Sequence, residues 1–212
     1  DDIIDEVLDG NNIEAVDVDL KTTSGRFITV SMTTSTVLSK HGAVIISFRD
    51  VTHQRSLEAQ LQQSRDFLEN LIDSAVDAIV AADLRGRIIV FNQGAEKLFG
   101  YKTEDIIGRS LVPRLYPEGV PKQVMKMLRS ESYGGVGRLE QLRREVVTSK
   151  GELVPVNMTA SIIYDGGREL ATVGIFSDLR DRIRIEQRLL QAQEELKQRE
   201  QQSMIAELAG AA

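Results

Sequence analysis

Residues 148–161 read TSKGELVPVNMTAS, and residues 22–35 read TTSGRFITVSMTTS. At one constant spacing, six positions of the earlier stretch match the later one: Thr22, Gly25, Val30, Met32, Thr33 and Ser35 match Thr148, Gly151, Val156, Met158, Thr159 and Ser161. Each stretch is followed by a second match, Phe48-Arg49-Asp50 or Phe176-Ser177-Asp178, and then by a polar, helix-like segment. A repeat of about 100 residues or more indicates a duplicated domain. Each domain is therefore expected to continue from its last strand into a helix, an arrangement that suits a signal relay better than a compact enzyme.

The composition excludes several classes of protein and site. The chain of 212 residues is long enough for one large or two small domains, and its 42% hydrophobic content is ordinary for a globular protein. Because the chain has no cysteine, it cannot form a disulfide, a thiolate nucleophile, a cysteine zinc site or a cysteinyl–flavin adduct. A net charge of −6 argues against nucleic acid as a partner.

Hydropathy and the first residue bear on location. The longest apolar run is far shorter than the ~20 residues of a membrane span, and no N-terminal signal pattern is visible. The chain begins with Asp1, which indicates a fragment of a longer protein. We therefore expect a cytoplasmic location and no membrane contact by this fragment.

The first repeat predicts a small sheet. Residues 1–8 have the apolar spacing of a short amphipathic helix, which the polar run at 9–12 breaks. Strands are expected at about 13–22, 26–37 and 42–50, joined by hairpin turns around Gly25 and Gly42.

Residues 77–178 predict a complete α+β domain. Two strands at 78–83 and 88–92 precede helical segments at 93–99, 103–107 and about 118–130, a glycine-rich loop at 133–137, and strands at about 140–149, 153–164 and 169–177. Short connections make neighbouring strands antiparallel. The expected result is one five-stranded sheet with helices packed on a single face.

Two long helices flank this domain, one over 52–76 and the other over 179–212. Apolar residues alternate in steps of three and four along both, at Leu57, Leu61, Ser64 (the one polar position), Leu68 and Leu71 in the first and at Ile185, Leu189, Ala192 and Leu196 in the second. This heptad spacing predicts a coiled-coil seam and hence a homodimer. The alternative is an amphipathic helix that lies on its own domain.

Four motifs carry a resemblance to a known family. Residues 91–101 read FNQGAEKLFGY, residues 104–108 read EDIIG, residues 150–156 read KGELVPV, and residues 176–178 read FSD. Over residues 67–182 the chain resembles the PAS-domain proteins, which implies the PAS fold. Residues 1–51 resemble only the C-terminal part of another PAS domain. Its Asp50-Val51-Thr52 matches the closing Asp-x-Thr of the family, whereas the second copy has Arg180 in place of the Thr.

The end of the chain adds a second resemblance. Residues 202–212, QSMIAELAGAA, are similar to the segment before the phospho-accepting His of sensor histidine kinases. The two resemblances imply the input region of a bacterial two-component kinase, with a kinase domain and a response regulator as partners in the intact protein. The alternatives are a ligand- or cofactor-loaded PAS sensor with another output, such as a diguanylate cyclase, and a PAS dimerisation platform. Because no catalytic constellation is arguable, the fragment itself is not expected to be an enzyme.

The PAS fold implies a pocket between sheet and helices. The candidate lining residues are Ile79, Ala81, Val90, Asn92, Leu111, Met125, Leu128, Val147, Met158, Ala160 and Ile175. The alternative is plain core packing, and a pocket built from such residues could be small and dry. At the strand–helix junctions, Asp50, Thr52 and Asp178 are expected to tie the last strand to its helix.

The sequence also bears on cofactors. Haem-binding PAS domains take an iron ligand from a His of the long helix, and residues 118–130 contain none, although Met125 or Met127 could ligate haem in principle. Blue-light flavin domains of this fold need a cysteine. We expect no cofactor, with non-covalent flavin or a small metabolite left open. His41 and His53 are isolated, which predicts no metal site.

Overall fold

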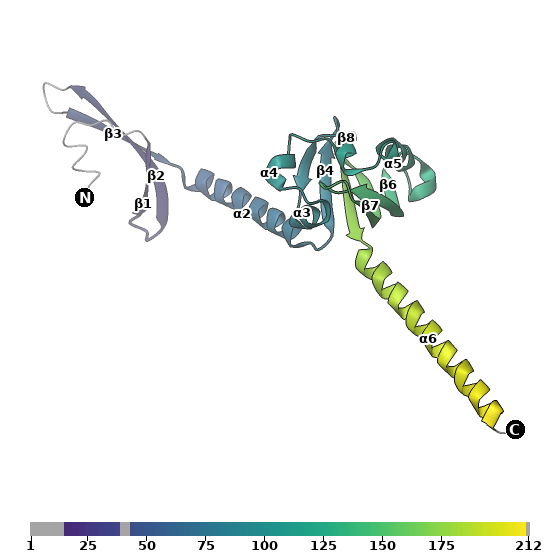
Figure 1. Ribbon diagram of the computed structural model, residues 1–212. Helices are drawn as coiled ribbons and strands as arrows, with labels where there is room; N and C mark the ends of the chain where they lie inside the picture. The colour runs from purple at the N-terminus through teal and green to yellow at the C-terminus, as the bar shows by residue number, and fades with distance from the viewer. Residues whose placement is uncertain (1–14, 39–42, 211–212) are drawn as a thin grey trace. The chain divides into compact units, whose positions relative to one another are not determined.

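The computed structural model describes residues 15–38 and 43–210 (Figure 1). The helix predicted at 1–8 and the turn around His41 lie outside the described residues. The chain divides into two compact units, Asp1–Glu69 and Asn70–Ala212.

The first unit contains a three-stranded antiparallel sheet. Its strands are β1 (Val16–Lys21), β2 (Phe27–Leu38) and β3 (Ala43–Asp50), in the order β1-β2-β3. The turn between β1 and β2 uses Gly25 at φ 82°, a conformation that other residues rarely adopt. All three predicted strands are therefore present. Helix α2 (Thr52–Ser74) follows β3 after a single residue.

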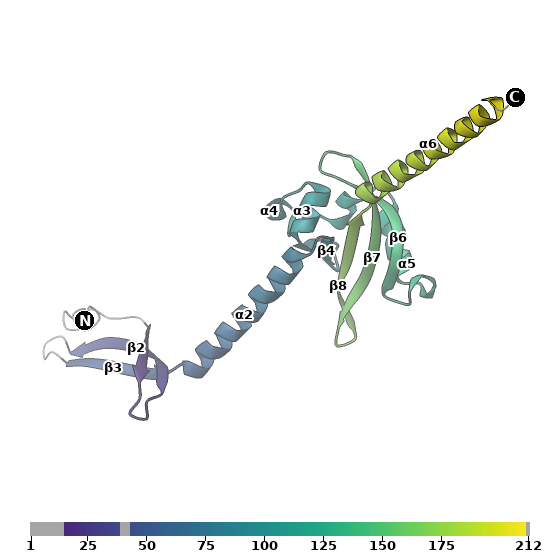
Figure 2. The ribbon, with the colours of Figure 1, turned by 90° about the horizontal axis from the view of Figure 1, so that it is seen from below.

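The second unit contains a five-stranded antiparallel sheet in the order β5-β4-β8-β7-β6. Its elements in chain order are β4 (Ala78–Asp83), β5 (Ile88–Phe91), α3 (Gln93–Phe99), α4 (Thr103–Ile106), η1 (Val112–Leu115), α5 (Val120–Leu128), η2 (Glu131–Tyr133), β6 (Arg138–Val147), β7 (Leu153–Asp165), β8 (Arg168–Asp178) and α6 (Arg180–Gly210). Helices α3, α4 and α5 cover one face of the sheet (Figures 1 and 2). The predicted α+β fold with one five-stranded sheet is confirmed.

The sequence prediction missed two 3₁₀ helices. Tyr133 ends the second of them, η2, although it was assigned to the loop at 133–137. The first, η1, contains Pro113 in its opening turn. Segments of three or four residues are too short to show the periodicity that identifies longer helices.

The core of the second unit lies between the sheet and the helices. Phe99, Ile106, Leu115, Leu128 and Met158 are among its fully buried side chains. Three of its aromatic rings form a cluster: the ring of Phe176 packs edge-on against that of Phe99 at 5.5 Å between centroids and lies 6.0 Å from that of Tyr116. Such aromatic pairs add to the burial of their apolar area.

A β-bulge reorients the edge strand β6. The pairing register with β7 shifts between Leu139 and Leu142, and Gln141 adopts φ 41°. Leu139 and Val146 lie seven positions apart, an odd step, so a regular strand would place them on opposite faces. Because of the bulge, both side chains are buried in the same core.

Candidate functional site

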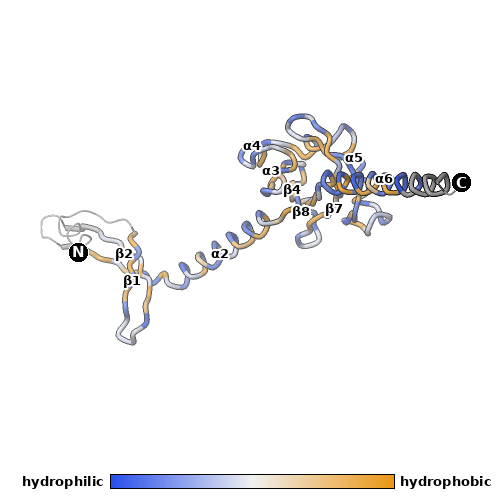
Figure 3. The backbone as a smooth tube through the Cα atoms, turned by 60° about the horizontal axis from the view of Figure 1, so that its bottom comes forward, coloured by the Kyte–Doolittle hydropathy of each residue, from blue (hydrophilic) through white to orange (hydrophobic). Residues whose placement is uncertain are grey.

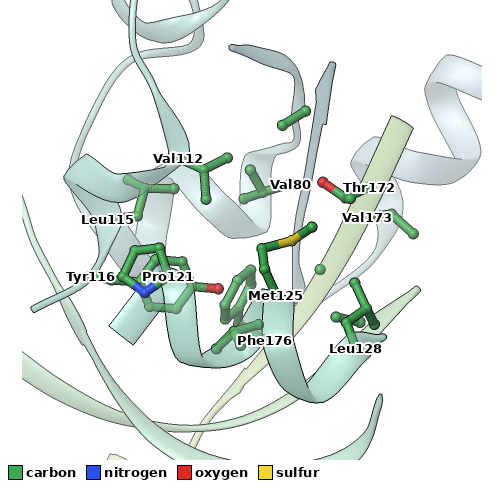
Figure 4. Close-up of a pocket in the computed structure, with 14 residues that line it drawn as sticks. Val80, Val112, Leu115, Tyr116, Pro121, Met125, Leu128, Thr172, Val173 and Phe176 are labelled. Atoms are coloured by element: carbon green, nitrogen blue, oxygen red, sulfur yellow. The ribbon is translucent and has the colours of Figure 1, made fainter. Parts of the chain in front are cut away.

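A small cavity lies inside the second unit, between the sheet and α5 (Figure 4). Its volume is about 70 Å³. Val80 on β4, Met125 and Leu128 on α5, and Phe176 on β8 contribute to its walls, and Met125 extends across it toward Thr172. Ligand pockets commonly measure about 300–1,000 Å³, whereas one water needs roughly 10–15 Å³. The cavity therefore has room for a few water-sized groups only.

Three of the eleven predicted pocket residues line this cavity: Met125, Leu128 and Ala160. The other eight do not: Ile79, Ala81, Val90, Asn92, Leu111, Val147, Met158 and Ile175. On β4 and β8 the prediction chose the wrong set of alternating residues, because Val80, Ala82, Gly174 and Phe176 face the cavity instead. A shift of one residue moves every side chain of a strand to the other face.

The remaining misplaced residues have other roles. Leu111 is half exposed, whereas Met158 is fully buried without lining the cavity. Tyr116 lines the cavity and was missed, because it follows the unpredicted helix η1. The signal that could have identified it is the pattern VPRLYP at 112–117, in which an apolar and an aromatic residue stand between two prolines.

The polar groups of the cavity are few. The hydroxyl of Tyr116 is buried, and its hydrogen-bond partner is the sulfur of Met158 at 3.1 Å. A thioether is a weak acceptor, so a stronger acceptor on a ligand can take its place as the partner of this single O–H donor. Burial raises the pKa of Tyr116, which keeps the phenol neutral. Among the described residues that line the cavity, none is charged. The site suits a small, mostly apolar group that carries one acceptor.

Asn92 is a structural residue rather than a pocket residue. Its side-chain oxygen accepts hydrogen bonds from the backbone N–H groups of Ile79 (2.8 Å) and Ala95 (2.9 Å). Its amide group donates to the carbonyls of Ile72 (2.9 Å) and Asp77 (3.0 Å). One buried side chain thereby joins the end of α2, the start of β4 and the N-terminus of α3.

The first strand–helix junction is built on Asp50 and Thr52. The backbone N–H of Thr52 donates to a carboxylate oxygen of Asp50 at 2.9 Å, as predicted for a cap. The Thr52 hydroxyl accepts a hydrogen bond from the backbone N–H of Thr29 at 2.9 Å and donates one to the backbone carbonyl of Thr29 at 3.4 Å. Hydrogen bonds from Thr52 hold the pKa of Asp50 below its usual value. The start of α2 is thus bonded both to its own strand and to β2.

The second junction is built on Asp178 and Arg180. The backbone N–H of Arg180 donates to Asp178 at 2.9 Å, and its guanidinium forms an ion pair with the same carboxylate. Burial by itself raises the pKa of Asp178, but the hydrogen bonds from Arg180 outweigh it and leave the pKa below its usual value. The N–H of Leu179 donates to the carbonyl of Pro155 at 3.0 Å. Arg180 therefore binds the strand from which α6 emerges.

The second unit matches a known family. A family model described as the PAS fold matches residues 66–179, just over half of the chain. The chain belongs to the PAS family. The resemblance predicted from the motifs at 91–101 and 150–156 is confirmed, with nearly the same limits as the predicted range of 67–182.

Relatives of this PAS protein include named sensor kinases. Sensor protein FixL of Bradyrhizobium diazoefficiens is 26% identical over 170 residues, which cover 77% of this chain and 32% of FixL. Sporulation kinase E of Bacillus subtilis is 30% identical over 118 residues, which cover 56% and 15% of the two chains. The cell-division control histidine kinase PdhS of Brucella abortus is 31% identical over 108 residues, which cover 50% and 10%. The chain spans at most about a third of the length of these relatives.

Solved structures similar to this chain are also PAS domains. The PAS domain of a Colwellia psychrerythraea protein is 26% identical, with a TM-score of 0.47, and the match covers 56% of this chain and 96% of that one. The PAS domain of an HTR-like protein from Haloarcula marismortui is 21% identical, with a TM-score of 0.48, and covers 58% and 98%.

The helices that flank the PAS domain expose their apolar seams. Within α2, all of which is described, no residue is buried. Leu57, Leu61, Leu68 and Leu71 are between 51% and 73% exposed, and Ile185, Leu189 and Leu196 of α6 are between 58% and 65% exposed. Figure 3 shows apolar stretches that recur along α2 between polar ones. An amphipathic helix packed on its own domain would bury one of its faces, and α2 has no buried residue.

Residues 15–38 and 43–210 contain no group of three or more His, Cys, Asp or Glu side chains that could hold a metal ion. His53 is exposed on α2. In the same part of the chain no helix has the length and apolar character needed to cross a membrane.

Proposed function

We propose that this chain is the cytoplasmic sensory and relay region of a sensor histidine kinase. In this proposal, residues 77–178 are the PAS sensor, residues 52–76 and 179–212 are signalling helices, and residues 1–51 are the C-terminal part of a first PAS domain. The observation that carries the proposal is the exposed heptad seam on both helices, because leucines at this spacing bury their surface against a second copy. The kinase names of the relatives support the choice of output.

The mechanism is a shift between two packings of the dimer. A signal changes how the last strands of the PAS domain pack, and Asp50 and Asp178 pass that change to the first turns of α2 and α6. The helices then change rotation or register within the dimer, which controls ATP-dependent autophosphorylation of a histidine in the intact protein. A response regulator is the next partner. In this proposal the chain supplies regulation, and the catalytic groups belong to the kinase domain of the intact protein.

Polar residues at seam positions tune the two states. Ser64 interrupts the first seam, and Arg199 and Ser203 continue the second. Polar groups at such positions lower the stability of a coiled coil and allow alternative registers. Replacement of all three by Leu in the intact kinase should lock one output state, whereas Leu at the exposed position Gln60 should leave the response unchanged. An intact signal response in the triple variant would refute the register mechanism.

Dimerisation is tested on the chain alone. Leu61→Lys combined with Leu189→Lys places two charges in the seams and should shift the chain from dimer to monomer in analytical ultracentrifugation. Gln60→Lys combined with Gln187→Lys adds the same charges at neighbouring exposed positions and serves as the control. A monomeric parent chain would contradict the proposal, as would a double seam variant that dimerises like the parent.

A ligand-loaded PAS sensor is the second candidate, with kinase or cyclase output. The observation that favours it is the apolar cavity with the buried hydroxyl of Tyr116. The ligand would be small, because the cavity is small, and it would be neither a cysteinyl–flavin, since the chain has no cysteine, nor a haem ligated by a histidine of α5, which has none. Native mass spectrometry and absorbance of the purified protein test this, with Ala160→Leu as a variant that fills the cavity. A pure dimerisation platform would give a kinase whose output is insensitive to any signal.

A further inference from the structure

The two strand–helix junctions occupy equivalent positions in their sheets. β1 and β2 pair in the same register as β6 and β7. Asp17 on β1 pairs with Ser31 on β2, and Arg143 on β6 pairs with Asn157 on β7. Asn157 is the residue that corresponds to Ser31 in the repeat. Residues at one junction can therefore be compared directly with those at the other. The four corresponding pairs are Asp17 and Arg143, Thr29 and Pro155, Thr52 and Arg180, and Arg55 and Ile183.

At the first junction, side chains link α2 to both neighbouring strands of its sheet. The Thr52 hydroxyl forms two hydrogen bonds with the backbone of Thr29 on β2. Arg55, one turn into the helix, donates to the carboxylate of Asp17 on β1 at 2.6 Å. The start of α2 is thereby linked to β2 and β1 as well as to β3.

At the second junction, all of these cross-links are replaced. Pro155 has no backbone N–H for a hydroxyl to accept, and Arg180 binds Asp178 of its own strand instead of β7. The counterparts of the Arg55–Asp17 ion pair are Ile183 and Arg143, which cannot pair. In the described part of the chain, no side-chain hydrogen bond joins the first turn of α6 to β6 or β7. The remaining link is the backbone bond from Leu179 to Pro155.

A groove occupies the place of the missing links. Arg143, Glu145, Pro155, Leu179 and Ile183 are among the residues that line it. Leu179 itself is buried, so it fixes one point of the chain at the floor of the junction. The helix beyond it has space on the side of β6 and β7 into which it can tilt.

We propose that the α6 junction is a compliant hinge that pivots at Leu179, whereas the α2 junction is a fixed clamp. The role of the α6 junction in passing on a signal rests on the proposed relay function. The flexibility of the junction itself can be measured on this chain alone. The compliance follows from the exchange of Thr29, Thr52 and Arg55 for Pro155, Arg180 and Ile183. A structural change in the PAS domain would then change the angle between α6 and its sheet. Helix α2 would instead move together with its own sheet.

Spin labels measure the hinge directly, because the chain contains no native cysteine. Lys122→Cys on α5 and Gln193→Cys on α6 are both exposed positions. Chains labelled at both sites are diluted into unlabelled chains, and double electron–electron resonance gives the distribution of distances between α5 and α6. The 212-residue chain should give a broad distribution. A distribution as narrow as that of a label pair within α6, at Gln187→Cys and Gln193→Cys, would overturn the proposal.

Rebuilding the first junction at the second sharpens the test. Pro155→Thr with Arg180→Thr restores the two hydroxyl bonds, and it should narrow the distance distribution and slow hydrogen exchange of the Leu179 amide by about three- to tenfold, the range that one added hydrogen bond supplies. Arg143→Asp with Ile183→Arg should narrow the distribution less, because the added ion pair is exposed. Arg180→Lys keeps the charge and should change neither the distance distribution nor the hydrogen exchange of the Leu179 amide. The variant is folded if core amides such as that of Val146 exchange hydrogen as slowly as in the parent chain. An unchanged distance distribution in such a folded Thr/Thr variant would also overturn the hinge.

These readings are separate from kinase output. If the hinge is present but autophosphorylation does not depend on it, the structural inference stands and the hinge has no part in the relay. A normal signal response of the intact kinase that carries Pro155→Thr with Arg180→Thr would lead to the same conclusion.

Discussion

The two sheets of this molecule carry matching strands and differ in what covers them. Phe176 on β8 is 3% exposed, whereas its counterpart Phe48 on β3 is 59% exposed. Met158 on β7 is fully buried, and its counterpart Met32 on β2 is partly exposed. The strand sequence therefore determines the strands and their register, but burial depends on elements from elsewhere in the chain. The aromatic rings of Phe99 and Tyr116 cover Phe176, and no described residue does the same for Phe48.

The largest difference between the two sheets is expected when the corresponding residues Phe176 and Phe48 are each replaced by alanine. Phe176→Ala should lower the free energy of unfolding of the second unit by about 3–5 kcal/mol, because it leaves a cavity in a packed core. Phe48→Ala should change the stability of the first unit by no more than about 0.5 kcal/mol, since the ring is exposed. Urea denaturation followed by circular dichroism measures both. A large cost for Phe48→Ala would mean that another chain covers the first sheet.

The next largest effect is expected at Asn92, which has no counterpart in the first sheet. Asn92→Leu should cost about 2–3 kcal/mol, because it leaves the buried backbone groups of Ile79, Asp77 and Ala95 without their partner. Gln93→Ala, at the exposed neighbouring position, is the control. Thermal unfolding distinguishes the two, and equal melting temperatures would contradict the role of Asn92 as the link between α2, β4 and α3.

The two junctions should differ in their response to loss of one side chain. Thr52→Val keeps the shape but removes both hydroxyl bonds to Thr29, at a cost of about 1–2 kcal/mol. Thr52→Ser retains the hydroxyl and should recover most of that cost. Arg180→Ala removes a partly exposed ion pair and should cost less than about 1 kcal/mol. A greater cost for Arg180→Ala than for Thr52→Val, measured by urea denaturation of each unit, would reverse the comparison.

The smallest effect is a pH dependence at Asp178. Because Arg180 holds the folded pKa of this carboxylate below its unfolded value of about 3.9, its contribution is present above that value and is lost as the pH falls through the folded pKa. The second unit should therefore lose a small part of its stability as the pH falls below about 4, and Asp178→Asn should flatten this part of the profile. An identical acid profile in the Asn variant, measured by thermal unfolding, would assign the acid sensitivity to other carboxylates.

The sequence predicted the order and type of the long elements but not the faces of the strands. The strand AIVAAD at 78–83 is apolar at nearly every position, so alternation gave no indication of which residues face the helices. The bulge at Gln141 has no sequence signal of its own, yet it changes the orientation of the residues that follow. The departure at Arg180 was visible in the sequence. The exchange of Thr29 for Pro155 is visible in the aligned repeats as well, but only the structure shows that Thr29 is the residue to which Thr52 bonds.

The bulge at Gln141 also affects how the protein behaves in concentrated solution. β6 is an outer strand, and its bulge and arginines make it a poor template for a strand of another molecule. β3 is an outer strand of the first sheet, although its counterpart β8 has a neighbouring strand on both sides, and β3 presents Ile45, Ile46 and Phe48 with one arginine. Self-association into fibrils or amorphous precipitate should therefore begin at β3, and shelf life should depend on whether that edge is capped.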